Sequence, residues 1–227
     1  MNRGEQDYIK AIYQLYEKAA TEKKEENYIS NNTLAEYLGH TPQTANETIK
    51  KLAKKDLLFY KPYKGCILTK MGREVGLRLV RVHRLWEVFL VEKLHYTWEE
   101  VHQEAEQLEH ATSSNLEKKL YYFLKEPNYC PHGNPIPDLS GKTAKKKLIP
   151  LSEGDPGVIY KFKKVVDKHE LLIYLNNKGI TLGDVLIVKE KDYFSKVLQI
   201  SKDQENIILG FNVSKFLFVE KIEGEFS

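Results

Sequence analysis

Four side chains of metal-binding types fall on one face of a predicted helix between residues 101 and 110. With about 100° of rotation per residue, they lie within a stripe roughly 100° wide, beside an apolar edge. They are His102, Glu106, Glu109 and His110. A second pair, His83 and Glu87, is spaced i,i+4 and therefore shares one face of another predicted helix. Imidazole and carboxylate groups bind divalent metals, so the pattern predicts a metal site, with an exposed polar helix face as the alternative.

Composition places broad limits on the chain. Its 227 residues, of which 41% are hydrophobic, are enough to bury a core in two domains or one large one. Two cysteines, Cys66 and Cys130, are too few for a disulfide framework, and no N-terminal apolar run resembles a signal peptide or a membrane span. We therefore expect a cytoplasmic protein with no membrane association. The net charge of +3 is too small to identify a partner.

The first third of the sequence has the pattern of a winged helix-turn-helix. Residues 8 to 16 form an amphipathic helix, and residues 17 to 27 form a charged connector. A short helix capped by Ser30 then ends near Gly39, and a second helix begins at Pro42, a residue favoured at the first helical position. Residues 57 to 69 read as two short strands around a turn in which Gly65 is free to take a positive φ, which is the pattern of a wing.

The charge distribution supports a nucleic-acid partner for this segment. Seven lysines and only two acidic residues lie between residues 43 and 70. A solvated surface is the ordinary explanation of such a cluster, but its coincidence with a winged helix favours duplex DNA. The candidate DNA-contacting residues are Thr41, Gln43, Thr44, Asn46, Glu47, Lys50, Lys51, Lys61, Tyr63 and Lys64. The first five could reach base edges and the others phosphates, although Thr41 fits the helix N-cap equally well.

The rest of the chain divides into helical and strand-rich parts. From about residue 69 a long helix carries an apolar stripe wide enough for a subunit interface, which predicts a homodimer. Five of the eight prolines lie between residues 127 and 150, and this stretch ends in a predicted linker. Beyond it, short strands between 157 and 222, with one helix near 170 to 177, fit a small β-barrel.

Five segments together resemble the diphtheria-toxin-repressor family of metal-dependent transcriptional regulators, especially its manganese-responsive branch. They are DYIKAIY at 7–13, PYKGCILT at 62–69, HRL at 83–85, HQEAEQLEH at 102–110 and CPHGNPIP at 130–137. The resemblance covers nearly the whole chain. It implies a mainly α fold with a small β domain.

The resemblance also implies an order of domains. Residues 1–72 would form a winged-helix DNA-binding domain, and residues 73–141 a helical metal-binding and dimerisation domain. Residues 142–150 would be a linker, and residues 151–227 an SH3-like barrel.

Two metal positions per subunit follow from the resemblance. The primary site would use Asp7, Glu106, Glu109 and His110. The secondary site would use His83, Glu87 and His102, completed by Asp167 or Glu170 from the C-terminal domain. A further pair, Cys130 and His132, is interpreted as part of a structured loop, because Cys-x-His alone is a weak signal.

Departures from the family pattern bear on the metal. Iron-responsive members usually carry Met where this chain has Asp7 and Cys where it has Glu106, so hard oxygen replaces soft sulfur here. Oxygen-rich sites suit Mn²⁺, although Fe²⁺ also fits. Some manganese-responsive members carry a second acidic residue in place of Lys10, which argues against a closely coupled two-metal cluster in this chain.

The leading hypothesis is therefore a manganese-responsive repressor of metal-uptake genes that binds a palindromic operator as a homodimer. One alternative is an iron-responsive repressor of the same family. Another is a winged-helix regulator whose histidines and glutamates form ordinary salt bridges. A metallohydrolase is disfavoured, because the sequence has no nucleophile motif, no His-Glu-x-x-His pair and no phosphate loop.

Overall fold

The computed structural model describes residues 1–21, 28–144 and 146–222. The chain divides into two compact units. The first comprises Met1–Trp86, Glu106–Glu126 and Pro137–Lys142, and the second comprises Glu87–Ala105, Pro127–Ile136 and the chain from Thr143 onward. Residues 22–27 of the predicted connector and Lys145 of the predicted linker lie outside the described residues. None of the described helices is both long enough and apolar enough to cross a bilayer.

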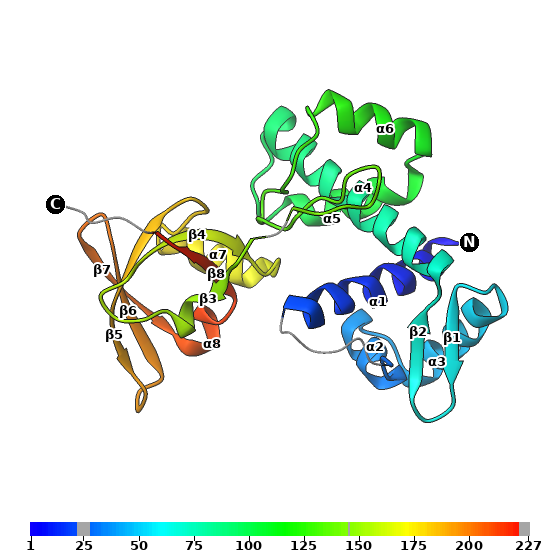
Figure 1. Ribbon diagram of the computed structural model, residues 1–227, viewed down its shortest axis with the longest axis horizontal. Coiled ribbons are helices and arrows are strands. Elements are labelled where there is room, and N and C mark those ends of the chain that lie inside the picture. The colour runs from blue at the N-terminus through cyan, green and yellow to red at the C-terminus, as the bar shows by residue number, and fades with distance from the viewer. Residues whose placement is uncertain (22–27, 145, 223–227) are drawn as a thin grey trace. The chain divides into compact units, whose positions relative to one another are not determined.

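The first unit begins with the predicted winged helix (Figure 1). Three helices, α1 (Arg3–Thr21), α2 (Asn31–Leu38) and α3 (Pro42–Lys54), precede the antiparallel strands β1 (Leu58–Lys61) and β2 (Gly65–Leu68). Helix α1 extends to Thr21, so the connector predicted to begin at residue 17 begins too early.

Helix caps and one glycine fix the local geometry of the winged helix. The side chains of Ser30 and Thr41 accept hydrogen bonds from backbone N–H groups in the first turns of α2 and α3, so both helices begin where the sequence predicts. The wing turn requires Gly65, which has φ of 109° and whose Cβ, if present, would lie 2.0 Å from the Ile29 carbonyl oxygen. Apolar side chains of all three helices, including Ile12 of α1, form one core.

Three further helices follow: α4 (Lys70–Leu94), α5 (Val101–Ala111) and α6 (Ser114–Phe123). Within the first unit, Arg78 and Arg81 of α4 donate to the buried carboxylate of Glu117 on α6, at 2.8 and 2.6 Å. Truncating one partner would leave the other charge poorly compensated, so this cluster holds α6 against α4.

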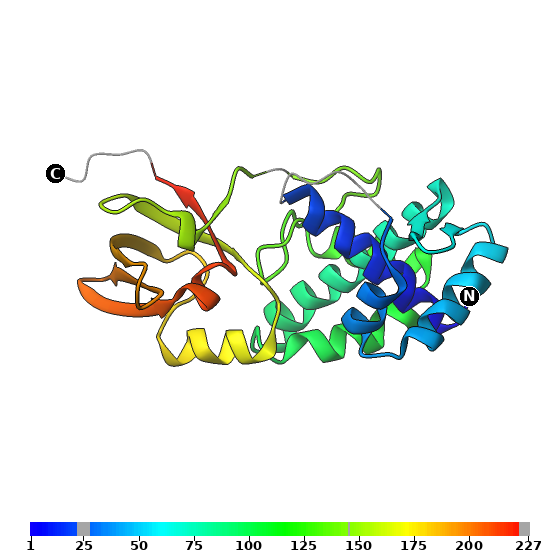
Figure 2. The ribbon, with the colours of Figure 1, turned by 90° about the horizontal axis from the view of Figure 1, so that it is seen from below.

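The second unit contains a six-stranded antiparallel sheet with the order β3-β8-β4-β5-β6-β7. Its strands are β3 (Ile149–Pro150), β4 (Ile159–Val165), β5 (Val185–Asp192), β6 (Val197–Lys202), β7 (Glu205–Gly210) and β8 (Leu217–Lys221). Helix α7 (His169–Asn177) lies beside the sheet (Figure 2). Its leucines belong to the core of this unit. A short helix, α8 (Phe211–Ser214), precedes β8.

The sheet agrees with the predicted strands and adds one. Strand β3 lies within the last two residues of the predicted linker, where Ile149 and Pro150 pair with β8. The described pairings end at β3 on one side and β7 on the other. An SH3-like β-sheet domain is thus present, and closure of a barrel remains a prediction.

Candidate functional site

Helices α1 and α5 bring three predicted primary-site ligands together in the first unit. Ligand atoms of Asp7, Glu109 and His110 all lie within 4.8 Å of one another. The Nε2 atom of His110 is 2.9 Å from Oδ1 of Asp7 and 3.5 Å from Oε1 of Glu109. A donor set of two carboxylates and an imidazole that converge in this way fits a divalent cation.

The second ring nitrogen of His110 orients this ligand. Its Nδ1 lies 2.7 Å from Oε1 of Gln6, an amide oxygen that can only accept a hydrogen bond. Nδ1 therefore donates a proton to Gln6, and this hydrogen bond holds Nε2 on the side of Asp7. Histidines that bind metals commonly have their other ring nitrogen held by an outer partner in this manner.

The electrostatics of Asp7 also fit a cation. Burial raises the pKa of Asp7, and the charges of Glu106 and Glu109 raise it further, against the opposing effect of His110. The surroundings of Asp7 thus disfavour its ionised form. A divalent cation would remove that penalty, because it offsets the repulsion between the carboxylates.

Lys10 occupies the other side of Glu109. Its ammonium Nζ is 2.7 and 2.9 Å from the two carboxylate oxygens of Glu109, 3.1 Å from Nδ1 of His83 and 3.4 Å from Glu106. His83 Nδ1 also contacts Oε2 of Glu109 at 2.6 Å. Burial raises the pKa of Glu109, but hydrogen bonds and charges from His83 and Lys10 outweigh burial and lower it. Glu109 is thus held ionised, which is the form that binds a metal.

Glu106 lies beside this cluster rather than within it. Its side chain is 44% exposed, and its carboxylate lies 3.4 Å from the ammonium of Lys10. Its negative charge reaches Asp7, whose pKa it raises. The structure therefore places three of the four predicted primary ligands together and the fourth one side chain away.

A second cluster forms within the second unit. Ligand atoms of Glu87, His102 and Asp167 lie within 4.8 Å of one another, and His102 Nδ1 is 2.7 Å from Asp167 Oδ2. Of the two candidate carboxylates, Asp167 is the one brought to this cluster, whereas Glu170 is exposed at the start of α7. His83 lies one helical turn before Glu87 on α4.

Two residues that sequence reasoning set aside join this cluster. The side chains of Cys130 and His132 are buried and lie within 4.8 Å of the Glu87 carboxylate. His132 Nδ1 is 3.2 Å from Glu87 and 3.7 Å from Asp167, while its Nε2 donates to the Trp98 carbonyl at 2.7 Å. The two residues lie in a structured loop, in which the Cys130 N–H donates to the Asn134 carbonyl at 3.0 Å; their convergence on Glu87 goes beyond that interpretation. The Cys-x-His spacing was the available signal.

The acidic surroundings keep His132 protonated when no metal is bound. Burial lowers its pKa, but hydrogen bonds to Cys130 and Glu87 and the charges of Glu87 and Asp167 outweigh burial and raise the pKa to about 12. The protonated imidazole of His132 lies beside the carboxylates of Glu87 and Asp167, and these two carboxylates could instead hold a metal cation. The Nδ1 atom is the one that would exchange its proton for a metal.

The reading helix and the wing present a polar, basic surface. Nine of the ten predicted DNA-contacting residues are exposed. The exception is Asn46, which is half-buried and whose Oδ1 accepts hydrogen bonds from Asn31 and Tyr60, at 3.2 and 3.3 Å. Thr41 caps α3, as its alternative role required, and Tyr63 stands fully exposed at the wing tip.

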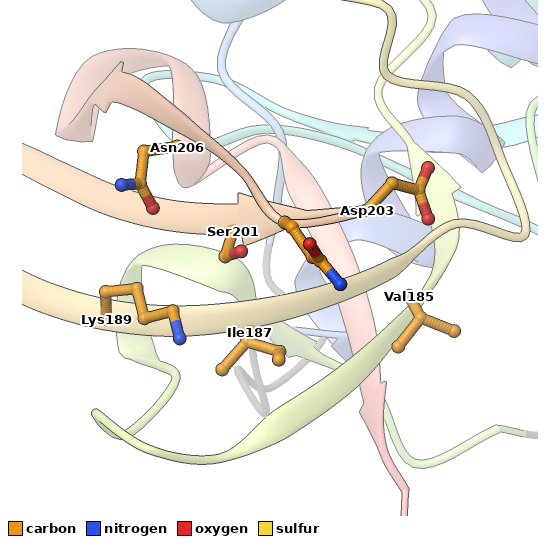
Figure 3. Close-up of a pocket in the computed structure, with 7 residues that line it drawn as sticks. Val185, Ile187, Lys189, Ser201, Asp203 and Asn206 are labelled. Carbon is orange, nitrogen blue, oxygen red and sulfur yellow. The ribbon is translucent and has the colours of Figure 1, made fainter.

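A pocket on the sheet of the second unit involves different residues. It lies on β5, β6 and β7 and is lined by Val185, Ile187, Lys189, Ser201, Asp203, Gln204 and Asn206 (Figure 3). None of the predicted metal or DNA residues lines it. The two metal-ligand clusters and the basic surface are therefore the features that bear on function.

A winged helix with a basic reading surface, in a chain that gathers imidazoles and carboxylates, defines a DNA-binding regulator with a metal site. Three family models match successive parts of the sequence. They are the N-terminal DNA binding domain of iron dependent repressors (2–66), the metal binding and dimerisation domain of the same repressors (69–138) and the FeoA domain (148–221). The chain belongs to the diphtheria-toxin-repressor family of metal-dependent transcriptional repressors, which are not enzymes.

Individual relatives match over almost their full length. A solved manganese-dependent transcriptional repressor in complex with manganese shares 32% identity, with 96% of this chain and 100% of that chain covered and a TM-score of 0.85. The manganese regulator SloR shares 34% identity, covering 98% and 100% of the two chains with a TM-score of 0.79. The iron-dependent repressor IdeR of Mycobacterium leprae is 29% identical over 228 residues, covering 95% of this chain and 96% of its own.

Proposed function

We propose that this chain is a manganese-responsive repressor that acts in the cytoplasm, as a homodimer, on palindromic operators of metal-uptake genes. The observation that carries the proposal is the convergence of Asp7 from α1 with Glu109 and His110 from α5. Oxygen donors predominate in this set, which suits Mn²⁺. The similarity to a repressor solved in complex with manganese supports the same choice.

The proposed primary ligands are Asp7, Glu106, Glu109 and His110. Because Glu106 is half-exposed, its side chain can turn from Lys10 toward Asp7 without disturbing the core. The proposed secondary ligands are Glu87, His102 and Asp167, with Cys130 and His132 added. His83 retains its proposed place at the secondary site, one turn before Glu87, and its contact with Glu109 gives it a part in the primary site as well.

The primary site lies where it can act on the reading helix. Asp7 belongs to α1, which shares a core with α3, whereas Glu109 and His110 belong to α5. A divalent cation bound here would supply positive charge that offsets the repulsion between the apposed carboxylates. Asp7, Glu109 and His110 then fix α1 relative to α5. In a homodimer this sets the separation of the two reading helices, which must match half-sites roughly 34 Å apart. The metal ligands thus pre-organise the DNA-binding surface without touching DNA.

Iron is the second candidate metal. The observation that favours it is the match to the iron-dependent repressor IdeR along nearly the whole chain. Fe²⁺ accepts the same oxygen and nitrogen donors as Mn²⁺ and binds most sites more tightly. In this alternative the chain has the same architecture, and its DNA binding responds to iron instead of manganese.

Titration of Mn²⁺ or anaerobic Fe²⁺ into the purified protein tests the proposal. The probe is a duplex selected by the wild-type protein from random-sequence DNA in the presence of Mn²⁺. We expect DNA affinity to rise at least 30-fold with Mn²⁺, since about 2 kcal/mol of coupling produces that factor. Glu106→Ala should abolish the rise, whereas Glu104→Ala, on the exposed face of the same helix, should not. DNA affinity that chelation leaves unchanged would refute metal control, and a response to Fe²⁺ alone would assign iron.

A further inference from the structure

We propose that Tyr8 and Glu5 are positioning residues that connect the metal site to the reading helix α3. The proposal rests on the function proposed above and names the contacts through which a fixed α1 positions α3. Both residues belong to the first two turns of α1, next to the metal ligand Asp7, and both bond to elements of the helix-turn-helix.

Tyr8 connects α1 to the start and the middle of the reading helix. Its side chain is 1% exposed, and its hydroxyl lies 3.0 Å from Nδ1 of His40, in the turn directly before the N-cap Thr41. The same hydroxyl is hydrogen-bonded to Thr48, two turns into α3. The rings of Tyr8 and His40 are also in contact, with centroids 5.7 Å apart. One phenol group therefore sets both where α3 begins and how it lies against α1.

Glu5 connects α1 to the other end of the reading helix. Its carboxylate oxygens accept hydrogen bonds from Nζ of Lys55, the C-cap residue of α3, at 2.7 and 2.8 Å. The carboxylate is 8% exposed, and Asn2 at the start of α1 holds it through a further backbone hydrogen bond. Hydrogen bonds to charged groups are stronger than neutral ones, and this one is partly shielded from water.

The spacing of the three residues divides α1 into two working faces. At 100° per residue, Glu5 and Tyr8 project about 60° apart, and Asp7 projects about 160° from Glu5. One face of the helix thus contacts α3 at both ends, and the other face reaches His110 on α5. Because the three residues lie within four positions of one continuous helix, Asp7 cannot be displaced without moving the two contacts to α3.

The variant Tyr8→Phe tests the first contact, because it deletes the hydroxyl and keeps the buried ring. Its matched control is Tyr16→Phe, which removes another hydroxyl from the same helix. The Tyr16 hydroxyl is buried and accepts a hydrogen bond from the backbone N–H of Leu68 in the wing. DNA affinity is measured on the Mn²⁺-selected duplex with saturating Mn²⁺ and with chelator, and Mn²⁺ affinity is measured with and without DNA. The melting temperature of each variant reports the fold.

For Tyr8→Phe we expect DNA affinity to fall about three- to tenfold in Mn²⁺ and to change less than about twofold in chelator, because the variant loses the hydroxyl's hydrogen bonds to His40 and Thr48. By reciprocity, Mn²⁺ affinity should fall by the same factor in the DNA complex and stay unchanged in the free protein. Tyr16→Phe should leave the ratio of the two DNA affinities unaltered. Equal losses with and without Mn²⁺, or equal effects of the two variants, would overturn the proposal.

The variant Lys55→Met tests the second contact and does not disturb the core, because the Lys55 side chain is 48% exposed. Lys54→Met removes the same charge from the preceding exposed residue and controls for weaker phosphate attraction. We expect Lys55→Met alone to lower the Mn²⁺-dependent gain in DNA affinity, and equal gains in the two variants would refute the role of Glu5. A wild-type protein indifferent to Mn²⁺ would instead refute the proposed function and, with it, this coupling.

Discussion

The buried carboxylate of Glu109 should have two separable roles, one in the fold and one in metal binding. Glu109→Gln keeps the shape of the side chain and removes its charge. The ammonium of Lys10, whose side chain is 5% exposed, then keeps an ion pair with Glu106 at 3.4 Å. The neutral amide also becomes a poor ligand beside Asp7 and His110. We therefore expect both stability and Mn²⁺ binding to fall.

The loss of stability can be bounded from the structure. Breaking a buried ion pair by removing one partner costs about 3–5 kcal/mol. Because Glu106 offers Lys10 partial compensation, we expect about 3 kcal/mol, a large share of a typical domain's stability. The double variant Lys10→Met with Glu109→Gln removes both buried charges and should recover most of that loss without recovering Mn²⁺ binding.

Urea unfolding in the presence of chelator measures the effect. The two tryptophans lie in different compact units, Trp86 in the first and Trp98 in the second, so a Trp98→Phe background makes fluorescence report the unit that contains Glu109. Isothermal titration with Mn²⁺ measures the second role. A Glu109→Gln variant destabilised by less than about 1 kcal/mol would refute the buried ion pair, since that is the range of exposed pairs. Recovery of Mn²⁺ binding in the double variant would refute Glu109 as a ligand.

Three further predictions concern other groups. The pKa of His132 is raised from 6.5 to about 12, so its stabilising effect on the metal-free fold is complete below about pH 6.5 and declines as pH rises toward 12. Metal affinity at the secondary site should rise with pH, and an unbuffered titration should show proton release that His132→Ala reduces. Burial raises the pKa of Cys66 to about 12, so iodoacetamide at pH 8 should modify this thiol only in urea, as mass spectrometry of the peptide would show. Lys64→Ala on the exposed wing should weaken DNA binding on all sequences and lower the slope of log affinity against log salt by about 1, whereas an unchanged slope would exclude a phosphate contact.

Local signals in the sequence predicted the winged helix well. Caps at Ser30 and Thr41, the proline at position 42 and the glycine at position 65 each impose a conformation through their own chemistry, so the elements begin where those residues stand. The end of α1 was misplaced because Glu17 and its neighbours are charged, and charged residues are good helix formers as well as connector residues. Composition alone does not separate these two uses.

The candidate sites depended more on long-range contacts. Helical spacing placed Glu109 and His110 on one stripe, but only packing of α1 against α5 brings Asp7 to them. The same stripe predicts Glu106 as a ligand as strongly as Glu109 and His110, although the Glu106 side chain turns toward Lys10. Periodicity identifies the face of a helix, whereas the torsions of a half-exposed side chain depend on neighbours from elsewhere in the chain.

The two clusters differ in the softness of their donors, and this difference bears on metal selectivity. The primary cluster offers oxygen and nitrogen, whereas Cys130 adds a thiol to the cluster of Glu87 and His132. Thiolate favours Zn²⁺ and other later metals over Mn²⁺. If the proposed secondary site binds such a metal, its occupancy depends on the concentration of that metal, whereas occupancy of the proposed primary site depends on the concentration of Mn²⁺. Under the proposed function, discrimination between metals then arises at Asp7 and its partners, because that cluster joins α1, and through it the reading helix, to α5.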